Sequence, residues 1–252
     1  MTRLLDVKDL RVAYGGVVAV NDVSLTIDEG EIVGLIGPNG AGKSSFIDAL
    51  TGAIAHRGGE VEFEGASLDG LPPHAVARRG LLRTFQSVEL FDDLTILENL
   101  MVAAERPRFL SMLRDLVAPS KPTGEADIAW AAQLCDLEDV LDRFPTEVSH
   151  GQRKLAGVAR ALATRPRLVL MDEPAAGLDT EESVAFGRRL RSLPSHGVGV
   201  LLVDHDMELV LGVCDRIYVI DFGRVIATGT PDMIRKSPRV IEAYLGGHNV
   251  EA

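Results

Sequence analysis

A glycine-rich octapeptide, Gly37 to Ser44, constrains the fold of this chain more than any other stretch. It fits the pattern G-x-x-x-x-G-K-[ST] and lies between the apolar run Ile32 to Ile36 and a segment of helical character. Glycines let such a loop turn its backbone N–H groups toward phosphate oxygens, and the following helix directs its positive dipole end at the same anions. The pattern therefore predicts a strand–loop–helix unit that binds a nucleoside triphosphate, rather than a chance glycine-rich turn.

Two side chains of this loop have separate chemical roles in the prediction. Lys43 is expected to reach the β and γ phosphates, and the Ser44 hydroxyl is expected to ligate Mg²⁺. The residues that we predict to line the nucleotide are consecutive: Gly37, Pro38, Asn39, Gly40, Ala41, Gly42, Lys43, Ser44 and Ser45.

Short apolar runs alternate with helical segments along much of the chain, which is typical of strands buried in a mostly parallel sheet. The runs lie at residues 32–36, 168–171, 198–203 and 217–220. The helical segments lie at about 43–53, 152–164, 180–194 and 206–214. This alternation predicts an α/β core.

Two stretches interrupt the alternation. Partly alternating runs before residue 64 predict an antiparallel β subdomain, and residues 91–160 predict an inserted helical subdomain. The core is thus expected to comprise residues 1–90 and 161–252. Within the insertion, the excursion at 105–125 contains an apolar and basic segment, which would either pack on the subdomain or contact a membrane or a membrane partner.

Adjacent acids end one of the buried runs. Asp172 and Glu173 follow Leu168 to Met171, and burying two acids there is costly unless they have a function. We predict that Asp172 holds Mg²⁺ and that Glu173 polarises the attacking water, the alternative being a capping pair before Pro174. His205 follows the next run and is predicted to contact the γ-phosphate, although a lone histidine is more often structural.

The charge balance argues against nucleic acid as a partner, because 37 acidic against 26 basic residues give a net charge of -11. The chain has no apolar run long enough for a membrane span and no secretory signal at its start. Its two cysteines lack metal-ligand spacing. We therefore expect a cytoplasmic chain that acts at a membrane only through a partner.

Taken together, these motifs resemble those of the ATP-binding subunits of ABC transporters over essentially the whole chain. The loop matches the Walker A motif, Leu168 to Asp172 matches Walker B, and Glu173 matches the catalytic glutamate. Further matches are the adenine-stacking aromatic residue, the Q-loop, the signature motif, the D-loop and the switch histidine. Their residues are Tyr14, Gln86, Ser149-His150-Gly151-Gln152, Asp179 and His205. From spacing alone, Tyr14 would be a packing residue, Gln86 a surface glutamine and Ser149 a helix N-cap.

The resemblance implies a P-loop NTPase (RecA-like) core, ATP and Mg²⁺ as cofactors, and Gln86 as a further Mg²⁺ ligand and catalytic residue. It also implies a head-to-tail dimer in which Ser149, Gly151, Gln152 and Asp179 act at the ATP of a second ATPase subunit. Two membrane-spanning permeases and an extracytoplasmic binding protein would complete the system, with this chain on the inner face of the membrane. His150 departs from the commonest signature residue, glycine.

Several stretches look like the larger ATPase subunit of branched-chain amino-acid importers (LivG-type). Examples are Arg83-Thr84-Phe85-Gln86, Pro174 to Leu178 and the closing Ile241 to Gly246. The lipopolysaccharide-export ATPase shares several of them. The expected function is ATP hydrolysis that powers amino-acid import, with lipid export or a soluble iron-sulfur cluster assembly ATPase as alternatives.

Overall fold

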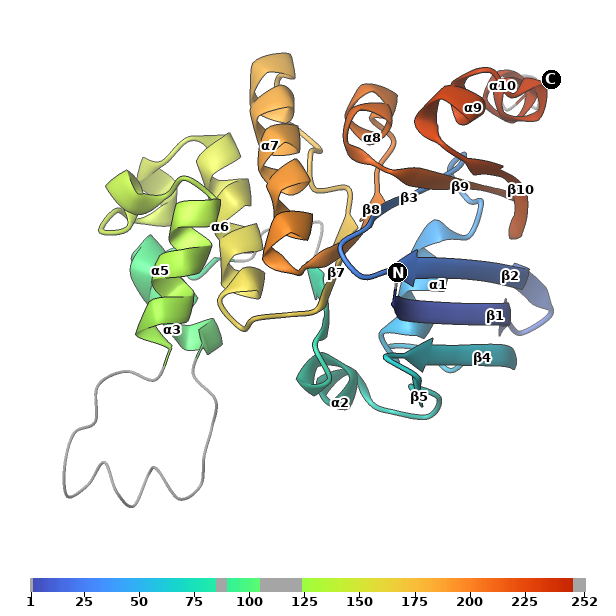
Figure 1. The fold of residues 1–252 in the computed structure, drawn as a ribbon, viewed down its shortest axis with the longest axis horizontal. Helices are drawn as coiled ribbons and strands as arrows, with labels where there is room; N and C mark the ends of the chain where they lie inside the picture. The colour runs from blue at the N-terminus through green and yellow to red at the C-terminus, as the bar shows by residue number, and fades with distance from the viewer. Residues whose placement is uncertain (1, 85–89, 105–123, 247–252) are drawn as a thin grey trace. The chain divides into compact units, whose positions relative to one another are not determined.

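The computed structural model describes residues 2–84, 90–104 and 124–246. It divides into two compact units, residues 1–86 with 167–252 and residues 87–166, and Figure 1 shows their elements. Among the described residues, no helix is long and apolar enough to cross a membrane.

A six-stranded sheet forms the centre of the first unit, in the order β10-β9-β3-β8-β7-β6 (Figure 1). Its strands are β3 (Ile32–Ile36), β6 (Leu81–Thr84), β7 (Leu168–Asp172), β8 (Gly199–Val203), β9 (Arg216–Asp221) and β10 (Arg224–Gly229). All neighbours are parallel except β9 and β10. Every residue of β3, β7 and β8 is buried, as the continuous apolar runs predicted.

A second, antiparallel sheet has the order β2-β1-β4-β5. It comprises β1 (Arg3–Tyr14), β2 (Val17–Asp28), β4 (Gly58–Phe63) and the short β5 (Ala66–Ser67). The buried residues of β1 and β2 face the core, where Leu5 pairs with Ile27 and Val7 pairs with Leu25. Helix α1 (Lys43–Leu50) contributes Phe46 to the same core cluster as residues of both sheets.

The remaining helices of this unit follow strands, except the last, which follows another helix. They are α2 (Pro73–Arg78), α7 (Thr180–Ser192), α8 (Met207–Val213), α9 (Pro231–Arg235) and α10 (Pro238–Gly246). Helices α7 and α8 lie side by side. The parallel strands β3, β6, β7 and β8 end at the same edge of the sheet, where side chains from several loops can converge.

The second unit is helical. Its helices α3 (Ile96–Ala104), α5 (Glu125–Leu134) and α6 (His150–Leu162) contact one another. The fully buried amide of Asn99 accepts a hydrogen bond from Phe91 N (2.8 Å) and donates to the carbonyls of Phe91, Leu94 and Thr95. These bonds hold the segment before α3 against the helix. The α/β fold class, with its antiparallel sheet and helical unit, is therefore confirmed.

Candidate active site

The glycine-rich loop runs from the end of β3 to the start of α1, as its motif predicts. Gly42 has φ 104°, and a Cβ there would lie 2.3 Å from the Ala19 carbonyl oxygen. A Cβ on Gly37 would lie 2.0 Å from the Ile220 carbonyl oxygen. Both positions therefore require glycine, because the backbone of the loop passes directly over neighbouring strands.

Lys43 begins α1 and directs its side chain back into the loop. Its Nζ donates hydrogen bonds to the carbonyls of Gly37 (2.7 Å) and Pro38 (3.0 Å), and the residue is 8% exposed. Burial lowers the pKa of Lys43, and the charges of Glu173 and Asp172 oppose that shift. The ammonium is thus held within the loop, close to the two acids at the end of β7.

Tyr14 ends β1 and lies beside the start of the same helix. Its hydroxyl donates to Ser45 Oγ (3.4 Å), while the residue remains 49% exposed. Ser44 is exposed at the first turn of α1. The structure therefore brings the predicted adenine-stacking residue to the predicted phosphate loop, with a ring surface open to solvent.

The ends of β7 and β8 carry the predicted hydrolytic residues. Asp172 is buried, whereas Glu173 adopts φ 48° and donates its N–H to the Val203 carbonyl (2.7 Å). His205 Nδ1 lies 3.7 Å from Glu173 Oε1, and the histidine side chain is 63% exposed. This contact joins the predicted water-polarising acid to the predicted switch histidine.

A buried carboxylate that the sequence analysis did not select supports these two loops. Asp204 is 1% exposed, and its oxygens accept from the backbone N–H groups of Ala175 (3.3 Å) and Asp206 (3.0 Å). Ala175 follows Glu173 closely, and Asp206 follows His205. Asp204 therefore ties the backbone of one predicted catalytic loop to that of the other.

Arg83 on β6 is a second residue that sequence reasoning missed. Its guanidinium donates to Asp172 Oδ2 (2.9 Å) and also to Asp48 Oδ1 on α1. The only sequence signal was its position directly before the predicted Q-loop. Gln86 itself lies outside the described residues.

The predicted signature residues lie in the helical unit, at the start of α6. Ser149 Oγ accepts from Gln152 N and Gln152 Oε1 accepts from Ser149 N, both at 3.1 Å, which forms a capping box. Gly151 is buried. In the other unit, Asp179 caps α7 by accepting from Glu182 N (2.9 Å). Each residue thus has a local structural role besides the predicted one.

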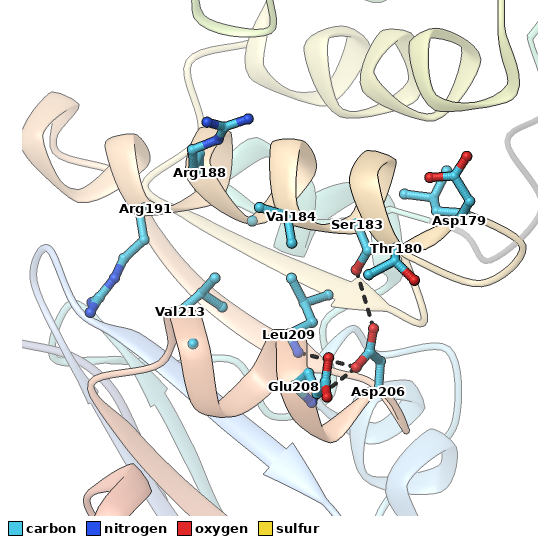
Figure 2. Close-up of a pocket in the computed structure, with 13 residues that line it drawn as sticks. Asp179, Thr180, Ser183, Val184, Arg188, Arg191, Asp206, Glu208, Leu209 and Val213 are labelled. Atoms are coloured by element: carbon cyan, nitrogen blue, oxygen red, sulfur yellow. Dashed lines mark hydrogen bonds between the residues drawn. The ribbon is translucent and has the colours of Figure 1, made fainter.

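Two cavities adjoin these motifs. One of about 810 Å³ is lined by Pro38 to Ala41, by the turn at Phe222 and by Arg239 of α10. In the same region, burial raises the pKa of the Tyr244 hydroxyl to about 12. The other cavity, of about 420 Å³, lies between α7 and α8; Figure 2 shows Ser183 bonded to Asp206 at its edge.

The donor set fits a magnesium ion held partly by phosphate. Within the described ranges, no group of three or more histidine, cysteine, aspartate or glutamate side chains could hold a metal by itself. Magnesium in such sites uses one or two protein oxygens together with substrate phosphates. A single carboxylate, Asp172, and a hydroxyl, Ser44, near the phosphate loop meet that requirement.

The fold and this site define a P-loop ATPase with an inserted helical unit. The family model described as "ABC transporter" matches residues 20–176, and a model described as "Branched-chain amino acid ATP-binding cassette transporter" matches residues 224–249. The chain therefore belongs to the ABC transporter family, as an ATP-binding subunit and an ATPase.

Curated relatives match nearly the whole chain. The high-affinity branched-chain amino acid transport ATP-binding protein BraF of Pseudomonas aeruginosa is 42% identical, covering 96% of this chain and 98% of the relative. Its counterpart LivG of Escherichia coli is 39% identical with the same coverage. The lipopolysaccharide export system ATP-binding protein LptB of Escherichia coli is 36% identical, covering 96% and 97%.

Solved structures agree with this assignment. The crystal structure of an ATP-binding cassette of an ABC transporter in its ADP conformation is 28% identical and superposes with a TM-score of 0.86. It covers 98% of this chain and 100% of the solved chain. A nucleotide-free cassette has a TM-score of 0.83 at the same identity, with coverage of 96% and 98%.

Proposed function

We propose that this chain is the ATP-hydrolysing subunit of an importer of branched-chain amino acids. The observation that carries the proposal is the 42% identity to BraF over 96% of the chain. The match of residues 224–249 to a branched-chain transporter model supports it, because this match covers β10, α9 and α10 rather than the phosphate loop common to P-loop ATPases.

Nucleotide binding would use the loop and the residues next to it. The ring of Tyr14 would stack on adenine, since half of its surface is open and its hydroxyl is anchored to Ser45. The ammonium of Lys43 would exchange its loop carbonyl partners for the β and γ phosphate oxygens. A buried cation of this kind interacts strongly with phosphate, because little water screens it.

Ser44 and Asp172 would hold Mg²⁺, with Gln86 as a further ligand. When bound, the ion neutralises charge on the β and γ phosphates. Asp172 suits this role because it is buried at the strand end and its Oδ2 accepts a hydrogen bond from Arg83. Ser44 suits it because it is exposed at the first turn of α1, next to Lys43.

Water attack would depend on Glu173 and His205. The backbone of Glu173, at φ 48°, departs from the extended path of β7. The Glu173 carboxylate can therefore face a different side of the site from the Asp172 carboxylate. His205, 3.7 Å from Glu173, would contact the γ-phosphate and orient that carboxylate. Glu173 would accept a proton from the attacking water as general base.

A complete site would need a second ATPase subunit, identical or homologous. Ser149, Gly151 and Gln152 would face the γ-phosphate bound to that subunit, and Asp179 would lie at the same interface. ATP that contacts both subunits favours the closed dimer, and hydrolysis removes that preference. Two membrane-spanning permeases would bind the pair at the cytoplasmic face of the membrane, and an extracytoplasmic protein would deliver the amino acid.

Transport by the reconstituted complex tests the proposal. The full chain would be tagged, purified from detergent-solubilised membranes of its source, and its permeases and second ATPase identified. Proteoliposomes of the complex and its binding protein should accumulate labelled leucine only when ATP is supplied, and the same complex with Glu173→Gln should not. Recovery of soluble partners alone would rule out the importer.

Lipid export is the second candidate, since LptB is 36% identical over 96% of the chain. The same preparation separates the two functions. ATP-dependent release of lipopolysaccharide from the proteoliposomes, without leucine uptake, would support export and contradict import.

A further inference from the structure

Arg83 connects two elements that carry the proposed Mg²⁺ ligands. It lies on β6, and in the parallel register with β7 it pairs with Leu170. Because side chains alternate along a strand, Arg83, Leu170 and Asp172 share one face of the sheet. This geometry lets the guanidinium reach the Asp172 carboxylate at 2.9 Å.

The other partner of Arg83 lies on the phosphate-loop helix. Asp48 is one helical turn after Ser44, so the two residues are on the same face of α1. Arg83 Nη1 donates to Asp48 Oδ1, while Nη2 donates to Asp172 Oδ2. One planar fork therefore spans from the helix that carries Ser44 to the strand that carries Asp172.

The burial of this triad makes its geometry costly to disturb. The side chains of Arg83, Asp48 and Asp172 are 17%, 29% and 10% exposed. Two carboxylates share one guanidinium, so loss of the cation would leave two negative charges with little water to separate them. Arginine suits this bridge better than lysine, because its donors are fixed in a plane whereas an ammonium is a point charge on a flexible stem.

We propose that Arg83 is a positioning residue, which orients the Asp172 carboxylate and fixes the spacing between Asp172 and Ser44 for Mg²⁺. The inference rests on the Mg²⁺ site in the proposed function. Arg83 donates to one oxygen of Asp172, Oδ2, and the fork holds the carboxylate in one orientation before the ion arrives. Residues that orient a metal ligand in this way commonly affect metal affinity by about tenfold or more.

Magnesium titration of nucleotide binding tests this role in the purified full chain. Fluorescence of N-methylanthraniloyl-ATP would be followed in EDTA and at increasing MgCl₂. Arg83→Met should raise the half-saturating Mg²⁺ concentration about tenfold. Its nucleotide affinity in EDTA should stay within about twofold of wild type, because Lys43 and the loop remain intact.

Two further variants distinguish the effect of the bridging geometry of Arg83 from the effect of its positive charge. Asp48→Asn keeps the contact between Arg83 and Asp172 but weakens the link to α1, and should raise half-saturation about threefold. Arg83→Lys keeps the charge without the planar fork and should also raise the half-saturating Mg²⁺ concentration. The double variant Arg83→Met with Asp48→Asn should be no worse than Arg83→Met alone.

Arg167 provides a matched control in the same unit. It also bridges two carboxylates, those of Glu29 (2.6 Å) and Glu64 (3.0 Å), but it precedes β7 at the opposite end from Asp172. Arg167→Met should leave the Mg²⁺ curve unchanged.

The outcomes distinguish the inference from the function on which it rests. An unchanged Mg²⁺ curve in Arg83→Met, with only a lower melting temperature, would overturn the positioning role. Wild-type behaviour of Arg83→Lys would overturn the fork, as would additive effects in the double variant. If wild-type nucleotide binding shows no dependence on Mg²⁺, the proposed Mg²⁺ site itself is wrong.

Discussion

Replacing Asp204 by alanine should destabilise the protein and impair hydrolysis together. The carboxylate is 1% exposed and accepts one backbone N–H on each oxygen, from Ala175 at 3.3 Å and Asp206 at 3.0 Å. Each donor left unsatisfied costs about 1–3 kcal/mol. Removing a buried charge offsets part of this loss, so we expect a net destabilisation of about 2–3 kcal/mol.

This change is large enough to measure by thermal unfolding. In a chain of this length, 1 kcal/mol corresponds to about 2–4 °C, so the unfolding midpoint of Asp204→Ala should fall by about 4–12 °C. Asp204→Asn keeps one acceptor oxygen but turns an amide donor toward the other N–H. Its unfolding midpoint should therefore lie between those of wild type and Asp204→Ala. Glu60→Ala is the control; Glu60 is exposed on β4, and its change should stay within about 0.5 kcal/mol.

ATPase activity provides the second readout for Asp204. Because its two hydrogen bonds link the loop after Glu173 to the loop after β8, Asp204→Ala should lower kcat more than nucleotide affinity at a temperature where it is still folded. A variant with the wild-type unfolding midpoint and wild-type kcat would refute the role that we derive from these two hydrogen bonds.

Four other predictions concern three residues of the proposed site. Lys43→Ala should abolish productive triphosphate binding in equilibrium dialysis. Burial lowers the pKa of Lys43 in the folded chain, so the unfolded chain binds that proton more tightly. The free energy of unfolding should therefore rise with pH between the lowered pKa and about 10.4. Lys43→Met should remove this pH dependence in urea unfolding. Glu173→Gln should bind ATP without hydrolysing it and accumulate an ATP-stabilised dimer on gel filtration; wild-type turnover would exclude Glu173 as the base. Ser149→Arg should bind nucleotide as a monomer yet fail to dimerise with ATP, and normal ATP-dependent dimerisation would contradict its action across the interface.

Local motifs predicted much of the core, because their residues are close in sequence. The loop from Gly37 to Ser44 requires a strand before it and a helix after it, and both are present as β3 and α1. Likewise, the acids at Asp172 and Glu173 follow a wholly buried strand. In each case the chemistry and the secondary structure depend on fewer than ten neighbouring residues, which a single sequence displays directly.

Contacts that depend on sheet order could not be predicted in the same way. Strand β6 (Leu81–Thr84) was not among the predicted core strands, because it is short and only its first residue is buried. Without β6 beside β7, nothing in the sequence places Arg83 next to Asp172. The sequence places Asp48 one turn after Ser44 on a predicted helix. Its partner Arg83, however, lies on a strand that is distant in the sequence.

The role of Asp204 was hidden for a different reason. Its sequence position, directly after an apolar run, does not distinguish a buried acceptor from an exposed acid, and the prediction at this strand end concerned His205. The structure shows that Asp204 is buried whereas His205 is exposed, because the first residue after β8 still faces the core. The acceptor geometry requires β7 and β8 to be neighbours, which is a property of topology and not of either strand alone.

In the proposed site, the charges at the end of β7 would link hydrolysis to nucleotide binding. Lys43 is near Asp172 and Glu173, and Arg83 contacts Asp172, so two cations and two acids share a partly buried space. In the proposed mechanism, Lys43 would exchange the carbonyls of Gly37 and Pro38 for phosphate oxygens, while Arg83 would keep its contacts with Asp172 and Asp48. Lys43 would then change its partners when nucleotide binds, and Arg83 would preserve the orientation of the Asp172 carboxylate. A lysine suits the first role because its flexible stem carries a point charge, and an arginine suits the second because its fork has a fixed plane.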